Sequence, residues 1–307
     1  LDLGIEAYGI GMTMDLGYPE TALNGDPHSA QFSQTVLSHN TVMVDEQQMG
    51  KPKRVSQPSL HFDAKDTRVK VVDAEIPIAY SQCKDYRRTI VMIDYDDEVS
   101  YGVDFFRVNG GKDHIYTFSP NSNDRPIHSD NLTFVKQVDD PQEDWIYDDN
   151  HYPFSSYAGA DVQFGWDPYT DMSKVEAPKK FPLGYTWMFN VERCDNPGEN
   201  EFWLDYAIKD FGKEPARNPN INIRLRVTML NDFDADEVSL VSTKPQRVKR
   251  NEKVGDLERF LVRRKGEKLD SLFTAVYEPY LAEKRYVADI QSETLAVEKI
   301  AGAGEDD

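Results

Sequence analysis

The 307-residue chain contains two cysteines and no long apolar run. Cys83 and Cys194 lie far apart, and two thiols are too few for a disulfide framework, so whether they pair stays open. No apolar run approaches the roughly 20 residues that a membrane-spanning helix needs. A glycine-rich phosphate loop, a nucleophile elbow and a Cys/His metal knuckle are absent as well. The function must therefore be argued from individual side chains and their order along the chain.

Basic residues are also scarce. The chain has 35 Lys and Arg residues against 54 Asp and Glu residues, which gives a net charge of −19. This charge disfavours nucleic acid or an anionic membrane surface as a partner. It leaves room for an anionic ligand, because a local basic groove can oppose the global charge. The acidity also fits a solvated surface suited to saline surroundings.

The start of the chain has neither an initiator methionine nor a signal peptide. It opens directly on residues 1–7, in which apolar and polar side chains alternate as they do in a strand. Because a protein rarely begins inside a strand, we expect these residues to belong to a longer protein. Its function would then depend partly on residues upstream of Leu1.

Strand signals recur along the whole sequence, while helical periodicity is weak. Short runs rich in β-branched and aromatic residues occupy 69–72, 88–93, 99–108, 115–118, 133–138, 186–191, 201–208, 221–229, 237–241, 260–264 and 272–277. The best helix candidate is the short tail after Ser292. Asn109-Gly110-Gly111-Lys112 has the composition of a hairpin turn. The pattern predicts an all-β protein, a layered antiparallel β-sandwich.

Two changes in composition divide the chain. Residues 139–182 are rich in Asp, Pro, Tyr and Trp, and a segment this long without strand signals is usually functional or disordered. Its aromatic rings either stack on sugars or fix the segment to its own sheet. A polar stretch near residue 231 precedes a more charged region. We therefore predict a central sandwich over 1–231 and a smaller C-terminal β unit with a tail over 232–307.

Asp15 and His39 are the best candidates for metal ligands. Asp15 ends one strand-like run and His39 opens another, and zinc favours imidazole nitrogen and carboxylate oxygen. Two such residues are no motif by themselves, and a buried histidine bonded to a carboxylate is the commoner arrangement. His61 and Asp63 would share one face of a strand, which is more typical of a surface strand than of a metal site.

Arg107 is a candidate for binding a uronate carboxylate, since a guanidinium on a sheet face makes bidentate contacts with such groups. The alternative is an arginine tied to a carboxylate on the sheet surface. Asp104 would point to the opposite face from Arg107, so the two are not an obvious pair. His114 is expected to be a packed sheet histidine.

Taken together, the order of these motifs resembles the C-terminal β region of the heparinase II/III-like polysaccharide lyases, a group that includes alginate and oligoalginate lyases. The resemblance covers about residues 1–280. It rests on Tyr8-Gly9, Asp15-x-Gly17-Tyr18, Ser38-His39-Asn40-Thr41, Tyr86-Arg87-Arg88-Thr89, Val103 to Gly111, and Leu272 to Pro279.

Such enzymes join a helical toroid to β-sandwich layers and cleave uronate-containing polysaccharides by β-elimination. The resemblance implies a structural zinc held by Asp15, His39 and a third ligand in a His-x-His segment upstream of Leu1. It places the catalytic Tyr and His upstream too, so no catalytic residue is assigned within this chain. It makes Tyr18, His28 and Asn40, with Arg107, candidates for substrate binding.

The expected partners are an acidic polysaccharide and the missing N-terminal helical domain, and the expected location is periplasmic or secreted. Two other functions stay open. One is a non-catalytic carbohydrate-binding or scaffold sandwich that shares the fold. The other is a hydrolase, which would need two carboxylates a few ångströms apart in a cleft. The sequence leaves open which uronate polysaccharide is cleaved.

Overall fold

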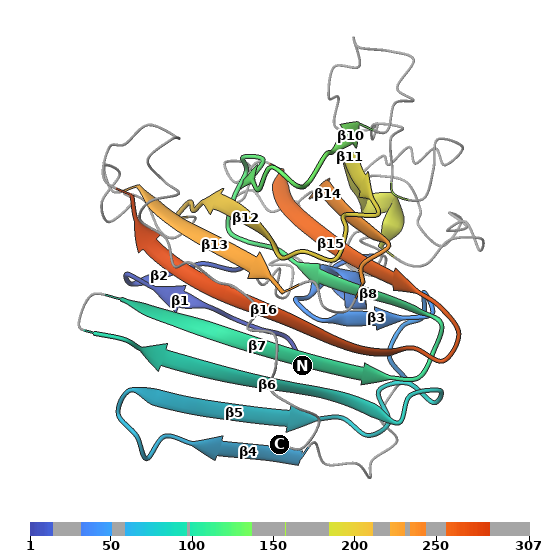
Figure 1. Cartoon of the computed structure of the whole chain (residues 1–307), viewed down its shortest axis with the longest axis horizontal. Coiled ribbons are helices and arrows are strands. Elements are labelled where there is room, and N and C mark those ends of the chain that lie inside the picture. Colours follow the sequence, from blue (N-terminus) through green and yellow to red (C-terminus); the bar gives the residue numbers. More distant parts are fainter. Residues whose placement is uncertain are drawn as a thin grey trace, which may run out of the picture.

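The computed structural model describes residues 1–14, 32–50, 59–96, 99–136, 157, 184–210, 222–230, 234–243 and 256–282. In these ranges the chain consists of antiparallel strands, with a few short helical turns (Figure 1). No helix in the described part is long and apolar enough to cross a membrane. The predicted all-β fold class is confirmed, and each of the eleven strand-like runs overlaps an observed strand.

One main sheet has six strands in the order β10–β11–β14–β15–β8–β3. Its strands are β3 (Val42–Val44), β8 (Asp113–Phe118), β10 (Val135–Lys136), β11 (Met188–Asp195), β14 (Glu237–Thr243) and β15 (Leu257–Lys265).

The other main sheet has eight strands in the order β4–β5–β6–β7–β16–β13–β12–β9. Its strands are β4 (Ser59–Asp63), β5 (Val69–Glu75), β6 (Asp85–Asp94), β7 (Ser100–Asn109), β9 (Ile127–His128), β12 (Phe202–Ala207), β13 (Ile223–Met229) and β16 (Asp270–Leu281). A short pair, β1 (Glu6–Ala7) and β2 (Ile10–Gly11), completes the described strands.

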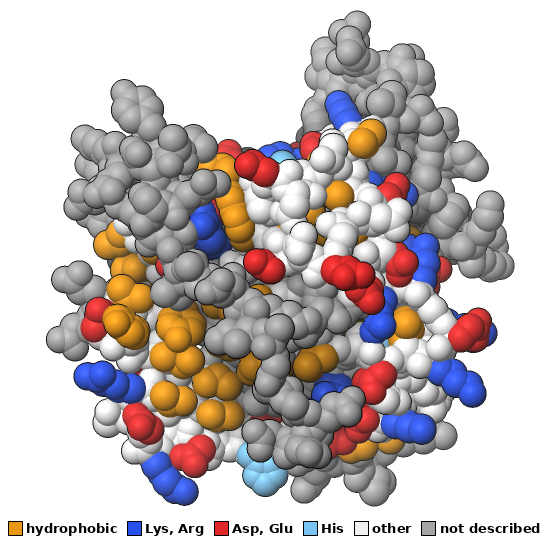
Figure 2. All heavy atoms as spheres, viewed as in Figure 1, with side chains coloured by type: hydrophobic (Ala, Val, Ile, Leu, Met, Phe, Trp, Pro, Cys, Tyr) orange, Lys and Arg blue, Asp and Glu red, His pale blue; other side chains and the backbone are white. Residues whose placement is uncertain are grey.

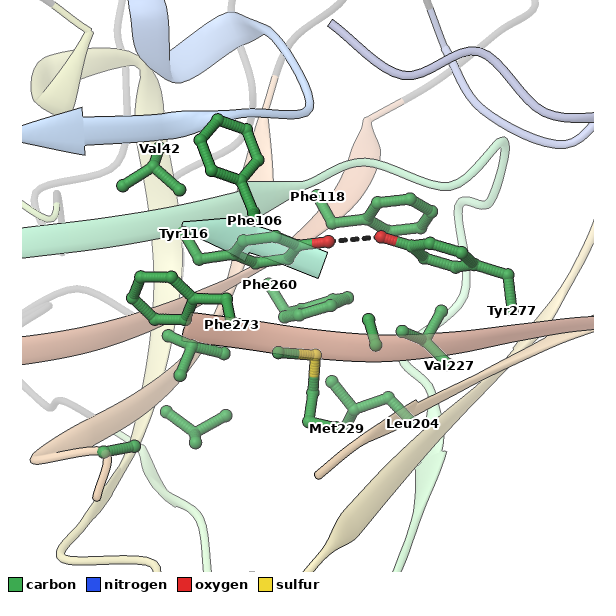
Figure 3. Close-up of a cluster of buried hydrophobic side chains, with 14 of the residues drawn as sticks. Val42, Phe106, Tyr116, Phe118, Leu204, Val227, Met229, Phe260, Phe273 and Tyr277 are labelled. Carbon is green, nitrogen blue, oxygen red and sulfur yellow. Dashed lines mark hydrogen bonds between the residues drawn. The ribbon is translucent and has the colours of Figure 1, made fainter. Parts of the chain in front are cut away.

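The core lies between the two main sheets. Alternate residues of each strand point inward, so aromatic rings from β8 meet rings from β16 (Figure 3). The Tyr116 and Phe273 ring centroids are 5.5 Å apart, and those of Phe118 and Tyr277 are 5.1 Å apart. Each such ring, fully buried, contributes roughly 1.5–3 kcal/mol to stability. This packing confirms the predicted sandwich.

A second apolar cluster covers the other face of the six-stranded sheet. Met43, Ile115 and Leu261 point to this side, where they pack with Phe32 and Leu37. Leu37 belongs to a 3-10 turn, η2 (Val36–Ser38), which leads directly into His39. The residues before His39 are thus anchored by apolar packing.

The turn at residues 109–112 differs from its prediction. It joins β7 of the eight-stranded sheet to β8 of the six-stranded sheet, so it crosses between sheets and is not a hairpin. Gly110 and Gly111 have φ values of +109° and +93°, a backbone region that other residues rarely adopt. Glycine identified the turn, but glycine does not specify which strands the turn pairs.

The predicted boundary at residue 231 also needs correction. Strands β14 and β15 lie between β11 and β8 in one sheet, and β16 lies between β7 and β13 in the other. Residues 237–281 therefore complete the central sandwich and do not form a separate unit. The composition changed at this point because a polar connection precedes β14, not because a new core begins.

The inner face of the eight-stranded sheet continues past the core as an apolar surface. Leu60 and Phe62 lie opposite Ala74 and Val72 in the ladder, on the same side as the core, yet Leu60 is 65% and Phe62 67% exposed. Figure 2 shows hydrophobic side chains gathered on the left half of one face of the molecule. Among the described strands, the eight-stranded sheet is thus wider than the six-stranded sheet that packs on it.

Candidate functional site

His39 lies between η2 and β3, where the chain passes from the outer apolar cluster into the six-stranded sheet. Its Nδ1 is 2.8 Å from Oδ2 of Asp2, and the other Asp2 oxygen accepts the backbone N–H of Asn40 at 2.7 Å. Both side chains are about one-third exposed, at 37% each. The carboxylate therefore fixes the orientation of an imidazole that solvent can reach.

The charge state of Asp2 determines which ring nitrogen carries the proton. Burial raises the pKa of Asp2, but hydrogen bonds from His39 and from the backbone of Asn40 and Leu3 outweigh it and hold the pKa below its usual value. Asp2 is thus ionised and accepts a hydrogen bond from the Nδ1–H group of His39. In neutral His39 this leaves the Nε2 lone pair available, and no described residue hydrogen-bonds that nitrogen.

Asn40 has a different role from the one predicted. It is 2% exposed, its side-chain N–H donates to the Leu3 carbonyl at 2.8 Å, and its Oδ1 accepts the Ser119 N–H at 2.7 Å. A buried amide engaged in this way is not available to a sugar hydroxyl. Asn40 instead ties the N-terminal segment to the loop after β8, which corrects the predicted substrate contact.

Arg88 supports the same segment from the core side. Its guanidinium makes a bidentate pair with Asp104, at 3.0 and 2.7 Å, and also donates to the carbonyls of Asn40 and Leu1. Burial lowers the pKa of Arg88, but the Asp104 carboxylate more than offsets this and holds the pKa above its usual value. An arginine that is paired with a carboxylate and also donates to two carbonyls is a stable anchor for the backbone.

Asp104 is fully buried and accepts further hydrogen bonds. The hydroxyls of Tyr116 and Tyr277 each donate to its Oδ2 at 3.1 Å, and the two hydroxyls also contact each other (Figure 3). Burial is the main reason that the pKa of both tyrosines lies above the usual value. Both therefore stay protonated and act as donors, so the network beneath Asn40 is polar but well satisfied.

Arg107 lies apart from this group. As the alternation predicted, it points to the opposite face of β7 from Asp104, where its Nη1 is 3.8 Å from Asp270. The half-exposed pair matches the alternative of an arginine beside a surface carboxylate. The structure does not bring Arg107 to His39, and its contact with substrate stays a prediction.

The other predicted site residues, Asp15, Tyr18 and His28, lie outside the described residues. The described part holds no group of three or more His, Cys, Asp or Glu side chains that could bind a metal. Of the two predicted metal ligands, only His39 lies in the described residues. Ligating histidines usually donate their second ring N–H to a carboxylate, as His39 does to Asp2.

His114 and the two cysteines lie away from His39 and take part in packing. His114 is buried between the Ser271 hydroxyl and the Gly110 carbonyl, which confirms it as a packed sheet histidine. Burial lowers its pKa, so it is neutral at physiological pH. Cys83 and Cys194 are both free thiols. His61 lies on the exposed strand β4, as expected for a surface strand.

Sequence reasoning missed the residues that hold His39 in place: Asp2, Arg88 and Arg259. Arg259 carried a usable signal. It lies two residues from Leu257 and from Leu261, so all three side chains share one face of the strand, and the two leucines indicate that this face is buried. Asp2 gave no such signal. Its contact with His39 spans 37 positions of sequence and depends on how the N-terminal segment crosses the sheet.

Comparisons with known proteins give a likeness in structure only. No family model and no curated protein matches the chain. Two solved structures of the heparan sulfate lyase HepC from Pedobacter heparinus, one of them a mutant, are similar to it. The mutant has 13% identity and a TM-score of 0.48, with 90% of this chain and 30% of the other covered. The other has 12% identity and the same TM-score, with 92% and 31% covered.

Heparinase III is a more distant neighbour, with 10% identity, a TM-score of 0.35, and 89% of this chain and 28% of the other covered. The chain thus spans less than a third of the length of each of these proteins. The likeness is a distant one in fold and says nothing about activity. The expected relation to alginate lyases finds no support in these comparisons.

Proposed function

We propose that the chain is the β-sandwich part of a polysaccharide lyase that cleaves an acidic, uronate-containing polysaccharide by β-elimination. The observation that carries the proposal is the His39 arrangement. The Ser38-His39-Asn40 motif is held by Asp2, Arg88 and Asp104, and a solvent-accessible imidazole projects from this rigid support. Several buried polar groups that together hold one partly exposed side chain are typical of a functional site.

In β-elimination a uronate loses its C5 proton and the glycosidic oxygen at C4 leaves. The carboxylate must be neutralised, a base must take the proton, and an acid must protonate the leaving oxygen. We propose that a Tyr and a His upstream of Leu1, in a helical domain, perform the proton transfers. This chain would supply one wall of the cleft, with Tyr18, His28 and Arg107 as candidate sugar contacts.

We further propose that His39 and Asp15 hold a structural zinc ion with a third ligand upstream of Leu1. Zinc would supply a cross-link between the Asp15 segment and the His39 segment. Asp2 would keep the imidazole oriented with Nε2 toward the metal, which is how a carboxylate beside a ligating histidine acts. A periplasmic or secreted location is proposed by analogy with such enzymes.

The reaction is tested by digesting a panel of acidic polysaccharides with the intact protein that contains this chain. Heparan sulfate comes first because it is the substrate named for the structural neighbours, followed by alginate and ulvan. A lyase produces an unsaturated uronate, so ultraviolet absorbance should rise in step with the release of reducing ends. We expect His39→Ala to lower this rate by at least tenfold, on the order of effects at metal ligands and their partners. The exposed His61→Ala variant should leave the rate unchanged.

Two outcomes would contradict the proposal. Reducing ends released without ultraviolet absorbance would identify a hydrolase. Saturable binding of a polysaccharide without release of any reducing end would identify a carbohydrate-binding sandwich.

A further inference from the structure

Three successive backbone carbonyls, those of residues 38, 39 and 40, accept hydrogen bonds from two buried arginines. Arg88 donates to the Asn40 carbonyl oxygen. Arg259 on β15 donates to the other two carbonyls, with Nη2 at 2.7 Å from the Ser38 oxygen and Nη1 at 3.2 Å from the His39 oxygen. Nη1 also donates to the Thr117 hydroxyl at 2.7 Å. The backbone around His39 is therefore held from below by two guanidinium groups.

The two arginines differ in their charge environment. Arg88 is neutralised by Asp104, whereas Arg259 has no carboxylate within ion-pair distance among the described residues. Arg259 is nevertheless only 1% exposed. A buried charge without a counter-ion is costly, and an apolar side chain would suit the neighbours Leu257 and Leu261 better. Packing alone therefore does not account for an arginine at this position.

Arg259 donates to three oxygens, those of the Ser38 and His39 carbonyls and of the Thr117 hydroxyl. Asp2 contacts the His39 ring and accepts the N–H of Asn40, so Arg259 and Asp2 both act on His39, one on its backbone and the other on its side chain.

We propose that Arg259 is a positioning residue that fixes the backbone of Ser38 and His39 and so presets the His39 imidazole for its ligand. The inference rests on the proposed zinc site for the identity of that ligand. The planar guanidinium is required because one group must reach two successive carbonyls and Thr117 at once. A lysine has the charge but not this geometry. Arg259 does not contact the ligand itself.

The test compares Arg259→Lys and Arg259→Met with Leu204→Ala in the intact protein. Leu204 lies on β12 and packs in the core between the sheets, outside the apolar cluster that holds η2, so its truncation lowers stability without removing a guanidinium. Two quantities are measured: zinc affinity by competition with a chelator, and hydrogen exchange of the His39 and Asn40 amides. These amides donate to the Val36 carbonyl and to Asp2, so they report local opening of this segment.

We expect both Arg259 variants to bind zinc about 10- to 100-fold more weakly, as mutations behind metal ligands typically do. Exchange of the two amides should accelerate at least tenfold, since hydrogen bonds to a charged group are lost. Leu204→Ala should change both quantities by less than about threefold. If Arg259→Met fails to fold, Arg259→Lys alone decides the comparison.

Wild-type zinc affinity and wild-type amide exchange in folded Arg259→Lys would overturn the inference. A wild-type protein that binds no zinc would refute the proposed metal site instead. In that case the amide exchange still decides whether Arg259 positions the His39 segment.

Discussion

At the scale of single residues, buried polar side chains of this protein act largely on the backbone. Asn40 and Arg88 each bond to main-chain groups of segments far away in sequence. The alternation of the sequence correctly predicted that Asp104 and Arg107 point to opposite faces. It could not predict that Asn40 is buried, because periodicity identifies the face of a strand but not which polar atoms find partners there.

Glu258 is a residue whose burial has a measurable consequence. Its side chain is 5% exposed, and it pairs with Arg125 at 2.8 Å and accepts the Ser242 hydroxyl at 2.8 Å. Burial nevertheless raises its pKa from 4.5 to about 7, despite the opposing effect of Arg125. Between these two values the folded state binds a proton that the unfolded state has released. The contribution of Glu258 to stability therefore falls as pH rises from about 5 to 8.

We predict that Glu258→Gln removes this dependence. The free energy of unfolding of the wild type, relative to the variant, should fall by about 2–3 kcal/mol between pH 5 and pH 8. Urea unfolding at the two pH values measures it. Glu267→Gln is the control, because Glu267 is 78% exposed and pairs with Lys112 at the surface. Parallel pH profiles for wild type and Glu258→Gln would show that the carboxyl titrates as it does in the unfolded chain.

At the scale of secondary structure, the strands were predictable and their partners were not. Runs of β-branched and aromatic residues predicted β5–β8 and β12–β16 because these strands are long and alternate regularly. Residues 1–7 also alternate, yet only Glu6–Ala7 form a strand. The first three residues instead accept hydrogen bonds from Arg88, His39 and Asn40. Likewise, the glycines at 110 and 111 predicted a turn, while the choice between hairpin and crossing depends on contacts distant in sequence.

The turn between the sheets should depend strictly on glycine at position 110. A Cβ there would lie against the Gln82 carbonyl oxygen, well inside van der Waals contact, and φ is +109°. Gly198 has a similar φ of +86° but open space around it, so it isolates the backbone effect. We predict a loss of about 1–2 kcal/mol for Gly198→Ala from backbone strain. Gly110→Ala should lose a further ~1–3 kcal/mol from the clash.

Urea unfolding of both variants at one pH measures these losses. Equal losses for the two variants would mean that the Gln82 segment gives way to the added methyl group. The close approach of this segment to Gly110 would then not be a constraint on the turn.

At the scale of the whole molecule, the layered sandwich was predictable and its division was not. The polar stretch near residue 231 has the composition of a linker, but β14, β15 and β16 on its far side fill central places in both sheets. Strand insertion of this kind leaves no mark in composition. The same long-range assembly brings Arg259, late in the chain, under His39 and Asp2, near its start. The candidate site thus depends on the complete sandwich.

We propose that this sandwich holds His39 ready to bind a structural metal ion. The test is elemental analysis of the intact protein, purified without chelators, beside its His39→Ala variant and the exposed control His61→Ala. We expect about one zinc per chain in the wild type and in His61→Ala, and almost none in His39→Ala. A wild-type protein without zinc, or a His39→Ala variant that retains it, would refute the metal site.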